Sequence, residues 1–272
     1  NKKKLYFCIL VSFNEWQFET LLPDNEKFIE TKLTELKMNE ILLISSLLFI
    51  YGTTLLAYRF LGRAGLFGMT VAVTILANIE VVILITAFGI EQTLGNVLFA
   101  TTFLITDILS ECEGKKYANR AVVMGLWASL FFLTISQSWR IYQPSINDTM
   151  HPMVYQLFSL TPRIIIASFI AFAISQFFDV WIYHKWWQFT EKRTGSRHRF
   201  LWLRNNGSTL ISQFINTLIF TMIAFVGIYD FKTLFSIFTS SYIIYFIASL
   251  LDTPIVYWAR KIKEKQNRTK IK

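Results

Sequence analysis

Hydrophobic residues gather in seven long blocks that are separated by short polar segments. An α-helix needs about twenty apolar residues to cross a hydrocarbon layer about 30 Å thick, and most of the blocks approach this length. The alternating pattern that is typical of a membrane β-barrel is absent from the sequence. The blocks therefore predict transmembrane helices at residues 41–60, 66–88, 94–109, 121–139, 164–183, 209–229 and 234–259.

The composition supports this interpretation. Of the 272 residues, 53% are hydrophobic and 17% are charged, whereas an ordinary soluble domain carries about 25% charged residues. The predicted fold class is all-α, a polytopic helical membrane protein. Its transmembrane domain is expected at residues 38–262, and a basic tail follows at 263–272. Residues 1–37 are interpreted as an extension outside the natural core, because their apolar stretch is too short to span a bilayer and Met38 directly precedes the first block.

The positive charges predict the orientation of the chain. The formal net charge is +9, and neither lysine nor arginine occurs in residues 141–161. If the chain spans the membrane seven times, its basic segments all fall on one side, and such segments are typically cytoplasmic. We therefore expect a multi-pass protein of the cell membrane with the C-terminus in the cytoplasm and the N-terminus outside. The same clustering explains the net charge without nucleic acid as a partner. The basic segments are 59–63, 115–120, 184–204 and 260–272.

The third block carries a carboxylate close to its end. Asp107 lies among apolar residues, and Glu111 follows four residues later, so both side chains project from one face of a continuing helix. A charge inside a membrane-length apolar run costs several kcal/mol unless it is paired or lines a polar cavity. Gly114, followed by two lysines, is the expected end of the helix. This stretch therefore predicts a functional site near the cytoplasmic side.

Polar side chains also occur inside the second and fifth blocks. Asn78 lies in the middle of the second block, where a hydrogen bond to a neighbouring helix is the alternative to a ligand contact. Arg163 opens the fifth block, and snorkelling to the membrane surface also explains it. Gln176 and Asp179 are three residues apart and share a helix face. Because aspartate is too short to reach the membrane surface, we expect Asp179 to belong to a site.

The sixth block begins with a polar stripe. Asn205, Ser208, Ser212 and Asn216 recur at intervals of three or four residues, so the stripe is expected to face protein or a cavity and not lipid. Helix packing through small residues is the alternative, although the number of amide groups favours a pocket. Asp252 in the last block is interpreted as structural, because the basic tail that follows could pair with it.

These positions together predict a cavity that is rich in hydrogen-bond acceptors and amides. Such a cavity suits a flat, polar and neutral heterocycle. The adjacent N–H donors of a guanine-like edge fit a carboxylate in bidentate fashion, and its carbonyl oxygen fits an amide or an arginine. Trp181 and Trp202 would supply stacking surfaces. Purine, pterin and flavin-like rings are not separated by this reasoning. The candidate substrate-binding residues are Asn78, Asp107, Glu111, Arg163, Gln176, Asp179, Trp202, Arg204, Asn205, Ser208 and Asn216.

Several strings of the chain are similar to those of a known family. They are TDILSE at 106–111, GKK at 114–116, RIIIAS at 163–168, SQFFDVWIYH at 175–184, LWLRNNGST at 201–209 and LLDTPIVY at 250–257. Across residues 38–262 the chain resembles the queuosine precursor transporter family, also called the vitamin uptake transporter family. The resemblance implies uptake of 7-cyano-7-deazaguanine, 7-aminomethyl-7-deazaguanine or queuine for tRNA modification. It also implies a six-helix core from residue 66 onward, with one extra N-terminal transmembrane helix at 41–60.

The chain departs from the family pattern at two positions. Asn216 stands in place of an aspartate, and Tyr245 stands in place of a lysine. Loss of one acid and one base together fits a former buried ion pair, because losing one alone would leave an unpaired charge. The hypothesis is that substrate selectivity is altered, for example toward queuine. The polar set that the resemblance implies is Asp107, Glu111, Arg163, Gln176, Asp179, Arg204 and Asn205.

Other functions fit the sequence less well. A substrate-binding subunit of an ATP-driven uptake system is the alternative to a carrier that works alone, since the sequence holds no nucleotide-binding loop. An intramembrane aspartyl protease is disfavoured, because Asp107 and Asp179 lie in TD and FD contexts and lack the YD and GxGD motifs. A structural scaffold would leave the polar stripe without a purpose. Two cysteines are too few for a disulfide framework or a metal cage, so no cofactor or metal is expected. A homodimer is left open.

Overall fold

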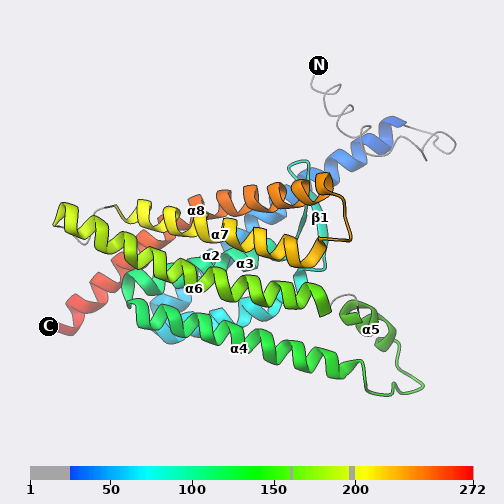
Figure 1. Cartoon of the computed structure of the whole chain (residues 1–272), viewed down its shortest axis with the longest axis horizontal. Coiled ribbons are helices and arrows are strands. Elements are labelled where there is room, and N and C mark those ends of the chain that lie inside the picture. Colours follow the sequence, from blue (N-terminus) through cyan, green and yellow to red (C-terminus); the bar gives the residue numbers. More distant parts are fainter. Residues whose placement is uncertain (1–24, 160–161, 196–199, 272) are drawn as a thin grey trace.

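The computed structural model describes residues 25–159, 162–195 and 200–271, and these form a bundle of long helices that lie roughly side by side (Figure 1). The first 24 residues of the predicted extension lie outside the described residues, whereas residues 25–37 belong to the first helix. The elements are α2 (Asn25–Glu80), β1 (Leu84–Ala87), β2 (Ile90–Thr93), α3 (Gly95–Cys112), α4 (Lys115–Trp139), α5 (His151–Ser159), α6 (Pro162–Thr194), α7 (Leu201–Phe225) and α8 (Phe231–Ile271).

The helices confirm a polytopic helical membrane protein. Five helices in the described residues are long and apolar enough to cross a membrane. Large hydrophobic side chains such as Phe49 and Trp127 lie exposed on the outside of the bundle, as expected of a surface that contacts lipid. The five candidate spans are Met38–Glu80, Lys115–Trp139, Ile166–Thr194, Leu201–Phe225 and Phe231–Arg268.

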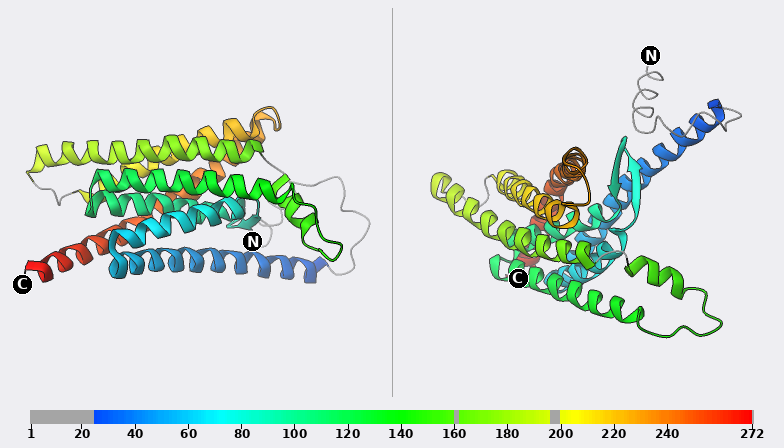
Figure 2. Two further views of the ribbon diagram at one scale, coloured as in Figure 1. Left: turned by 90° about the horizontal axis from the view of Figure 1, so that it is seen from below. Right: turned by 45° about the vertical axis from the view of Figure 1, so that its right-hand side comes forward.

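Helix α2 contains the first predicted block and most of the second. The chain reverses at Gly62, whose φ of 60° and ψ of −143° are not helical, and a positive φ is readily adopted by glycine because it has no Cβ. Figure 2 shows the two halves of α2 running back along each other. The region therefore contributes two antiparallel helices, as the two apolar blocks predict.

The second predicted helix ends earlier than expected. A helix through residue 88 is wrong, because the chain leaves the helix at Glu80 and forms an antiparallel hairpin of β1 and β2. Residues Phe88 and Gly89 form the two-residue turn, and both have positive φ, as in a type I′ hairpin. The β-branched side chains of the run before the turn favour a strand. Periodicity alone does not separate such a short apolar run from a helix.

Helix α3 lies at the centre of the bundle. Fifteen of its 18 residues are buried, and it packs against α2, α4, α6 and α8. Its end confirms the predicted stop, since Gly114 has a φ of 93° and its N–H donates to the carbonyl of Leu109 at 2.8 Å. Helix α3 therefore presents its polar side chains to several helices at once.

The basic segments meet at one end of the bundle, together with the C-terminus (Figure 1). The Gln266 side chain donates to the carbonyl of Arg59 at 3.2 Å, and the Arg63 guanidinium lies 4.5 Å from the centre of the Tyr117 ring. The hairpin, α5 and the turn between α7 and α8 lie at the opposite end. The distribution of basic segments between the two ends is the one that the sequence predicts. We call the end that holds the C-terminus and the basic segments the basic end.

Candidate substrate site

The polar stripe of α7 faces the interior of the bundle, as predicted. Asn205, Ser208 and Ser212 are fully buried, and Asn216 is 5% exposed. Helix α7 packs between α6 and α8 (Figure 1). The Ser175 hydroxyl of α6 donates to the side-chain amide oxygen Oδ1 of Asn216 at 3.3 Å. The stripe therefore supplies hydrogen-bonding groups to the centre of the protein.

Asp107 of α3 and Asp179 of α6 form a pair of buried carboxylates. Both side chains are fully buried, and they lie beside each other. Asp107 Oδ2 accepts a hydrogen bond from the Thr209 hydroxyl at 2.9 Å. Within the described residues, Asp107 Oδ1 and both carboxylate oxygens of Asp179 have no hydrogen-bond partner. The pair therefore presents three unused acceptor atoms inside the bundle.

A third carboxylate, Asp252 of α8, completes what we call the carboxylate cluster: Asp107, Asp179 and Asp252. It is 1% exposed and close enough to interact electrostatically with the other two. The Tyr51 side chain of α2 lies against it. The sequence interpretation paired Asp252 with the basic tail. In the structure, Arg260, the first residue of the basic segment 260–272, instead lies 3.2 Å from Glu264 and 3.7 Å from Glu111.

Further polar atoms of the cluster and of the residues beside it also have no hydrogen-bond partner among the described residues. The Ser212 hydroxyl lies beside Asp179, and the Asn205 amide reaches toward Thr253, the neighbour of Asp252. Among the described residues, Ser212 Oγ, Asn205 Oδ1 and Asp252 Oδ1 have no hydrogen-bond partner. A buried polar group without a partner costs about 1–3 kcal/mol. Because most of these atoms are acceptors, a ligand that satisfies them must bring several donors.

The second predicted carboxylate of α3, Glu111, is fully engaged. The Arg204 guanidinium of α7 donates to both Glu111 oxygens, at 2.7 and 2.6 Å through one nitrogen and at 3.0 Å through Nε. The Tyr183 hydroxyl donates to Glu111 at 2.8 Å. Arg204 is also 4.6 Å from the centre of the Trp187 ring. This group of residues joins α3, α6 and α7 at the basic end, which favours a role in positioning over ligand contact.

Gln176 is brought to the same region and is already hydrogen-bonded. Its amide nitrogen donates to the Thr102 hydroxyl at 2.6 Å, and its carbonyl oxygen accepts from the Thr106 hydroxyl at 3.2 Å. Both bonds connect α6 to α3. Gln176 and Asp179 share one face, as their spacing predicts, and Gln176 holds α6 against α3 one turn before Asp179.

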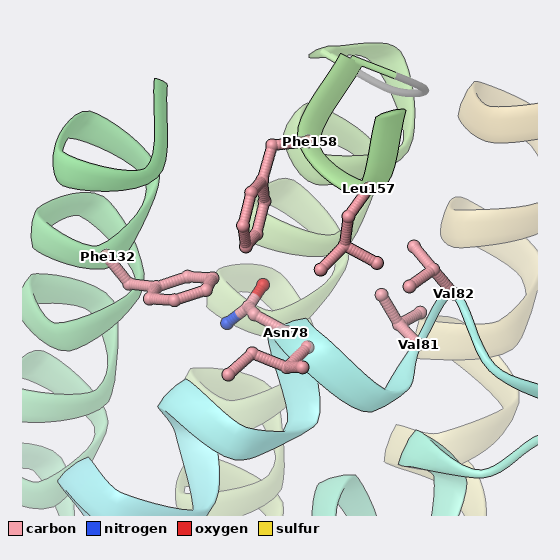
Figure 3. A pocket seen from close by; sticks show the side chains of 7 residues that line it. Asn78, Val81, Val82, Phe132, Leu157 and Phe158 are labelled. Atoms are coloured by element: carbon pink, nitrogen blue, oxygen red, sulfur yellow. The ribbon is translucent and has the colours of Figure 1, made fainter. Parts of the chain in front are cut away.

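Asn78 is separate from the carboxylate cluster. Its amide donates to the Thr74 carbonyl at 2.8 Å and to the Ser129 hydroxyl at 3.2 Å, which is the interhelical bond that the alternative interpretation describes. Figure 3 shows Asn78 beside a cavity between Phe132 and Phe158. The cavity measures about 10 Å³, which is at most the space of one water molecule.

Arg163 and Trp202 are also apart from the cluster. The Arg163 guanidinium donates to the carbonyls of Ile223 and Val226 at 2.6 Å each, where a cation stabilises the negative end of the α7 dipole. Trp202 is 53% exposed and Trp181 is 46% exposed. The structure therefore places both tryptophans toward the outside of the bundle and not around a central ligand.

The cluster is closed to the outside and holds no evident metal site. Each of its carboxylates is at most 1% exposed, so a ligand reaches them only if helices move. In residues 25–159, 162–195 and 200–271, no group of three histidine, cysteine or acidic side chains is arranged to hold a metal ion.

Buried ionisable side chains inside a helical membrane bundle mark a functional site, and transporters are one class of protein that places its substrate site at the centre of such a bundle. Comparison with known proteins agrees. Residues 93–259 match the family described as "Putative vitamin uptake transporter", and the chain belongs to this family. It is 37% identical over 215 residues to the "Probable queuosine precursor transporter" of Bacillus subtilis (strain 168), which covers 79% of this chain and 92% of that protein. No solved structure matches the chain.

The family match places the cluster within the shared region. Asp107, Asp179 and Asp252 all lie between residues 93 and 259, whereas Tyr51 and Asn78 precede it. The sequence analysis named Asp107 and Asp179 as candidate site residues and interpreted Asp252 as structural. Asp252 lies in an apolar helix two residues before Pro254, where a short acidic side chain needs a partner inside the bundle.

Proposed function

We propose that this protein imports queuosine precursors, which are 7-deazaguanine bases, across the cell membrane for tRNA modification. The observation that carries the proposal is the set of unused acceptor atoms around Asp107 and Asp179. A guanine-like edge presents a ring N–H and an exocyclic amine side by side, and a carboxylate accepts both. The substrate named for the Bacillus subtilis relative has this chemistry.

The closed site suits a carrier that works by alternating access. The carboxylates are buried from both ends of the bundle, and Glu111 with Arg204 joins α3 to α7 at the basic end. Import requires this end to open after the ligand has entered from the opposite end. Separation of α7 from α3 at the basic end would break the Glu111–Arg204 pair, which therefore acts as the inner closure.

The topology follows from the positions of the charges. We assign the basic end to the cytoplasm, because positively charged segments between spans are retained there. The C-terminus is then cytoplasmic and the start of α2 lies outside. In this assignment residues 38–262 form the transporter domain, in which the first half of α2 is an added helix beside a six-helix core. Cysteine labelling at residues 146 and 267, one at each end, tests the orientation from either side of intact cells.

Ligand-dependent thermal stabilisation of the detergent-purified protein tests the substrate. A ligand at about one hundred times its Kd adds about 2.7 kcal/mol to the folded state. Each kcal/mol raises Tm by about 2–4 °C in a protein of this size, so a shift of about 5–11 °C is expected. The panel is 7-cyano-7-deazaguanine, 7-aminomethyl-7-deazaguanine, queuine, guanine and biotin. A folded protein that no 7-deazaguanine stabilises would contradict the proposal.

Two controls separate specific binding from general effects. Asp179→Asn removes an unused carboxylate and should abolish the shift, while Asn78→Leu, distant from the cluster, should leave it unchanged. Uptake of the bound ligand into liposomes that contain this protein alone then tests transport. Uptake only after addition of an ATPase module would instead assign the chain as the binding subunit of an ATP-driven system.

A further inference from the structure

The carboxylate cluster has no cationic partner within the part of the chain that the structure describes. The hydrogen bond that Asp107 accepts comes from the neutral Thr209 hydroxyl. Arg204, on the neighbouring turn of α7, is bound to Glu111. Buried charges are normally paired, so a member of the cluster becomes a stable carboxylate only when a positive charge is brought to it from outside the chain.

The cluster is more than a set of acidic residues. Ser212 and Asn205 of α7 are fully buried, and within the described residues Ser212 Oγ and Asn205 Oδ1 have no hydrogen-bond partner. Ser212 lies directly beside Asp179. Buried hydroxyl and amide groups are nearly always hydrogen-bonded in native structures. Their unused capacity, next to unused carboxylates, indicates a place for a polar ligand.

Asp252 approaches this place from a different helix. Asp107 and Asp179 lie beside each other and face α7, whereas Asp252 comes from α8. Two residues later, Pro254 lies inside α8, and proline has no N–H to donate to the carbonyl four residues earlier. The Leu250 carbonyl therefore lacks its usual helical donor. On the α8 side of the cluster, Asp252 Oδ1 is the acceptor without a hydrogen-bond partner among the described residues, and it comes from a different helix than the Asp107–Asp179 pair.

We propose that the site selects 7-deazaguanines that carry an ammonium group, and that Asp252 is the carboxylate that receives it. This inference rests on the proposed function. The N–H edge of a 7-deazaguanine lies on its six-membered ring, and the substituent at C7 lies on its five-membered ring. A single carboxylate cannot contact both the N–H edge and the substituent at C7, because they lie on different rings. The Asp107–Asp179 pair accepts the N–H edge, and Asp252 neutralises the substituent.

This assignment separates the precursors by charge. An alkyl amine is protonated near neutral pH, as the lysine side chain is, so 7-aminomethyl-7-deazaguanine and queuine are cations. The nitrile of 7-cyano-7-deazaguanine is neutral and donates no hydrogen bond. The ligand is therefore a cation, in place of the neutral heterocycle that the sequence suggests.

Binding measurements on the full-length protein in detergent test the selection. The three ligands are 7-aminomethyl-7-deazaguanine, its neutral counterpart of equal size 7-hydroxymethyl-7-deazaguanine, and 7-cyano-7-deazaguanine. Because a hydrogen bond between charged groups is markedly stronger than one to a neutral group, the amine should bind about tenfold or more tightly than either neutral ligand. Equal affinities for the amine and the alcohol would overturn the inference, and this comparison needs no variant.

Asp252→Asn tests the residue itself. The variant should weaken amine binding about tenfold or more and change binding of the neutral ligands less than about threefold. Asp252→Glu, which keeps the charge, should retain the preference for the amine. The matched control is Glu264→Gln, which removes a carboxylate from the same helix at a side chain that is 47% exposed. An equal loss of affinity for all three ligands in Asp252→Asn would show that Asp252 does not distinguish the charged ligand from the neutral ones.

The proposed function and this inference fail in different ways. If none of the three ligands binds the folded protein, the proposed function is wrong and the inference falls with it. If all three bind with the same affinity, the proposed function stands and only the selection by charge is wrong.

Discussion

Replacement of Glu111 with glutamine tests whether the basic end is held closed by a buried ion pair. Glu111 accepts three hydrogen bonds from Arg204 and one from Tyr183. The Arg204 side chain is fully buried, and the Glu111 side chain is 3% exposed. Glutamine keeps the size of the side chain and removes its charge, so the guanidinium loses its counter-ion inside the bundle.

The expected effect is large. Removal of one partner from a buried ion pair costs about 3–5 kcal/mol, because the other charge is left uncompensated. With about 2–4 °C for each kcal/mol in a protein of this size, Glu111→Gln should lower Tm by about 6–20 °C. The double variant Glu111→Gln/Arg204→Met removes both charges and should recover part of the loss. The two single changes are therefore non-additive, as expected of residues in contact.

Thermal unfolding of detergent-purified variants provides the measurement, and Glu264→Gln provides the control. Glu264 pairs with Arg260 at 3.2 Å but is 47% exposed, and an exposed pair contributes about 0–1 kcal/mol. The control should therefore shift Tm by less than about 4 °C. A Tm for Glu111→Gln within the range of the control, or a double variant equal to the sum of the single ones, would refute the reasoning.

Three further predictions follow from the structure. Asp179→Asn should raise Tm by a few degrees without ligand, because the new amide N–H can donate to the unpartnered Asp107 Oδ1 and so removes part of a cost of about 1–3 kcal/mol; a lower Tm would contradict the absence of a donor to this pair. The double variant Asn216→Asp/Tyr245→Lys should change the ratio of the Kd values for 7-aminomethyl- and 7-cyano-7-deazaguanine. The reason is that position 245 lies two helical turns before Asp252 on the same face of α8. An unchanged ratio counts against altered selectivity. Hydrogen bonds from the Thr233 hydroxyl and from the backbone lower the pKa of Asp230 at the start of α8, so this carboxylate stabilises the fold above the ordinary aspartate pKa of about 3.9. The Tm deficit of Asp230→Ala, measured against pH, should therefore shrink as the pH falls below that value, and a constant deficit would argue against the cap.

The sequence predicted the bundle and the burial of Asp107, Asp179 and the α7 stripe, because a polar group inside an apolar helix must face protein or a cavity. Asp107 and Asp179 are short acidic side chains inside apolar blocks, so they had to face protein. The stripe from Asn205 to Asn216 had to do the same, and the structure buries it. In each case one helix, considered alone, was sufficient to fix which side faces inward.

The failures concern features that depend on neighbouring helices. Trp202 was expected near a ligand, yet it is 53% exposed, because an aromatic side chain is equally stable against lipid and against protein. Asp252 was assigned to the basic tail, since sequence distance does not show that Tyr51 and Asp179 lie beside it. The hairpin at residues 84–93 was missed because a short apolar run has no distinctive period.

Glu111 of α3 is fully hydrogen-bonded, whereas Asp107 of the same helix has an unpartnered oxygen, and both contact α7. This difference allows α3 and α7 both to hold a ligand and to close the bundle. Glu111 follows Asp107 by four residues on α3, and Arg204 precedes Thr209 by five residues on α7. The Glu111–Arg204 ion pair and the Thr209–Asp107 hydrogen bond therefore lie about one helical turn apart on the same interface. A ligand that binds Asp107 through its unpartnered Oδ1 leaves the Thr209 hydrogen bond to Oδ2 in place. The ion pair is itself almost fully buried, with Arg204 0% and Glu111 3% exposed, so it holds the basic end closed while the ligand is bound. We therefore expect release at the basic end to require a separate movement of α7 away from α3.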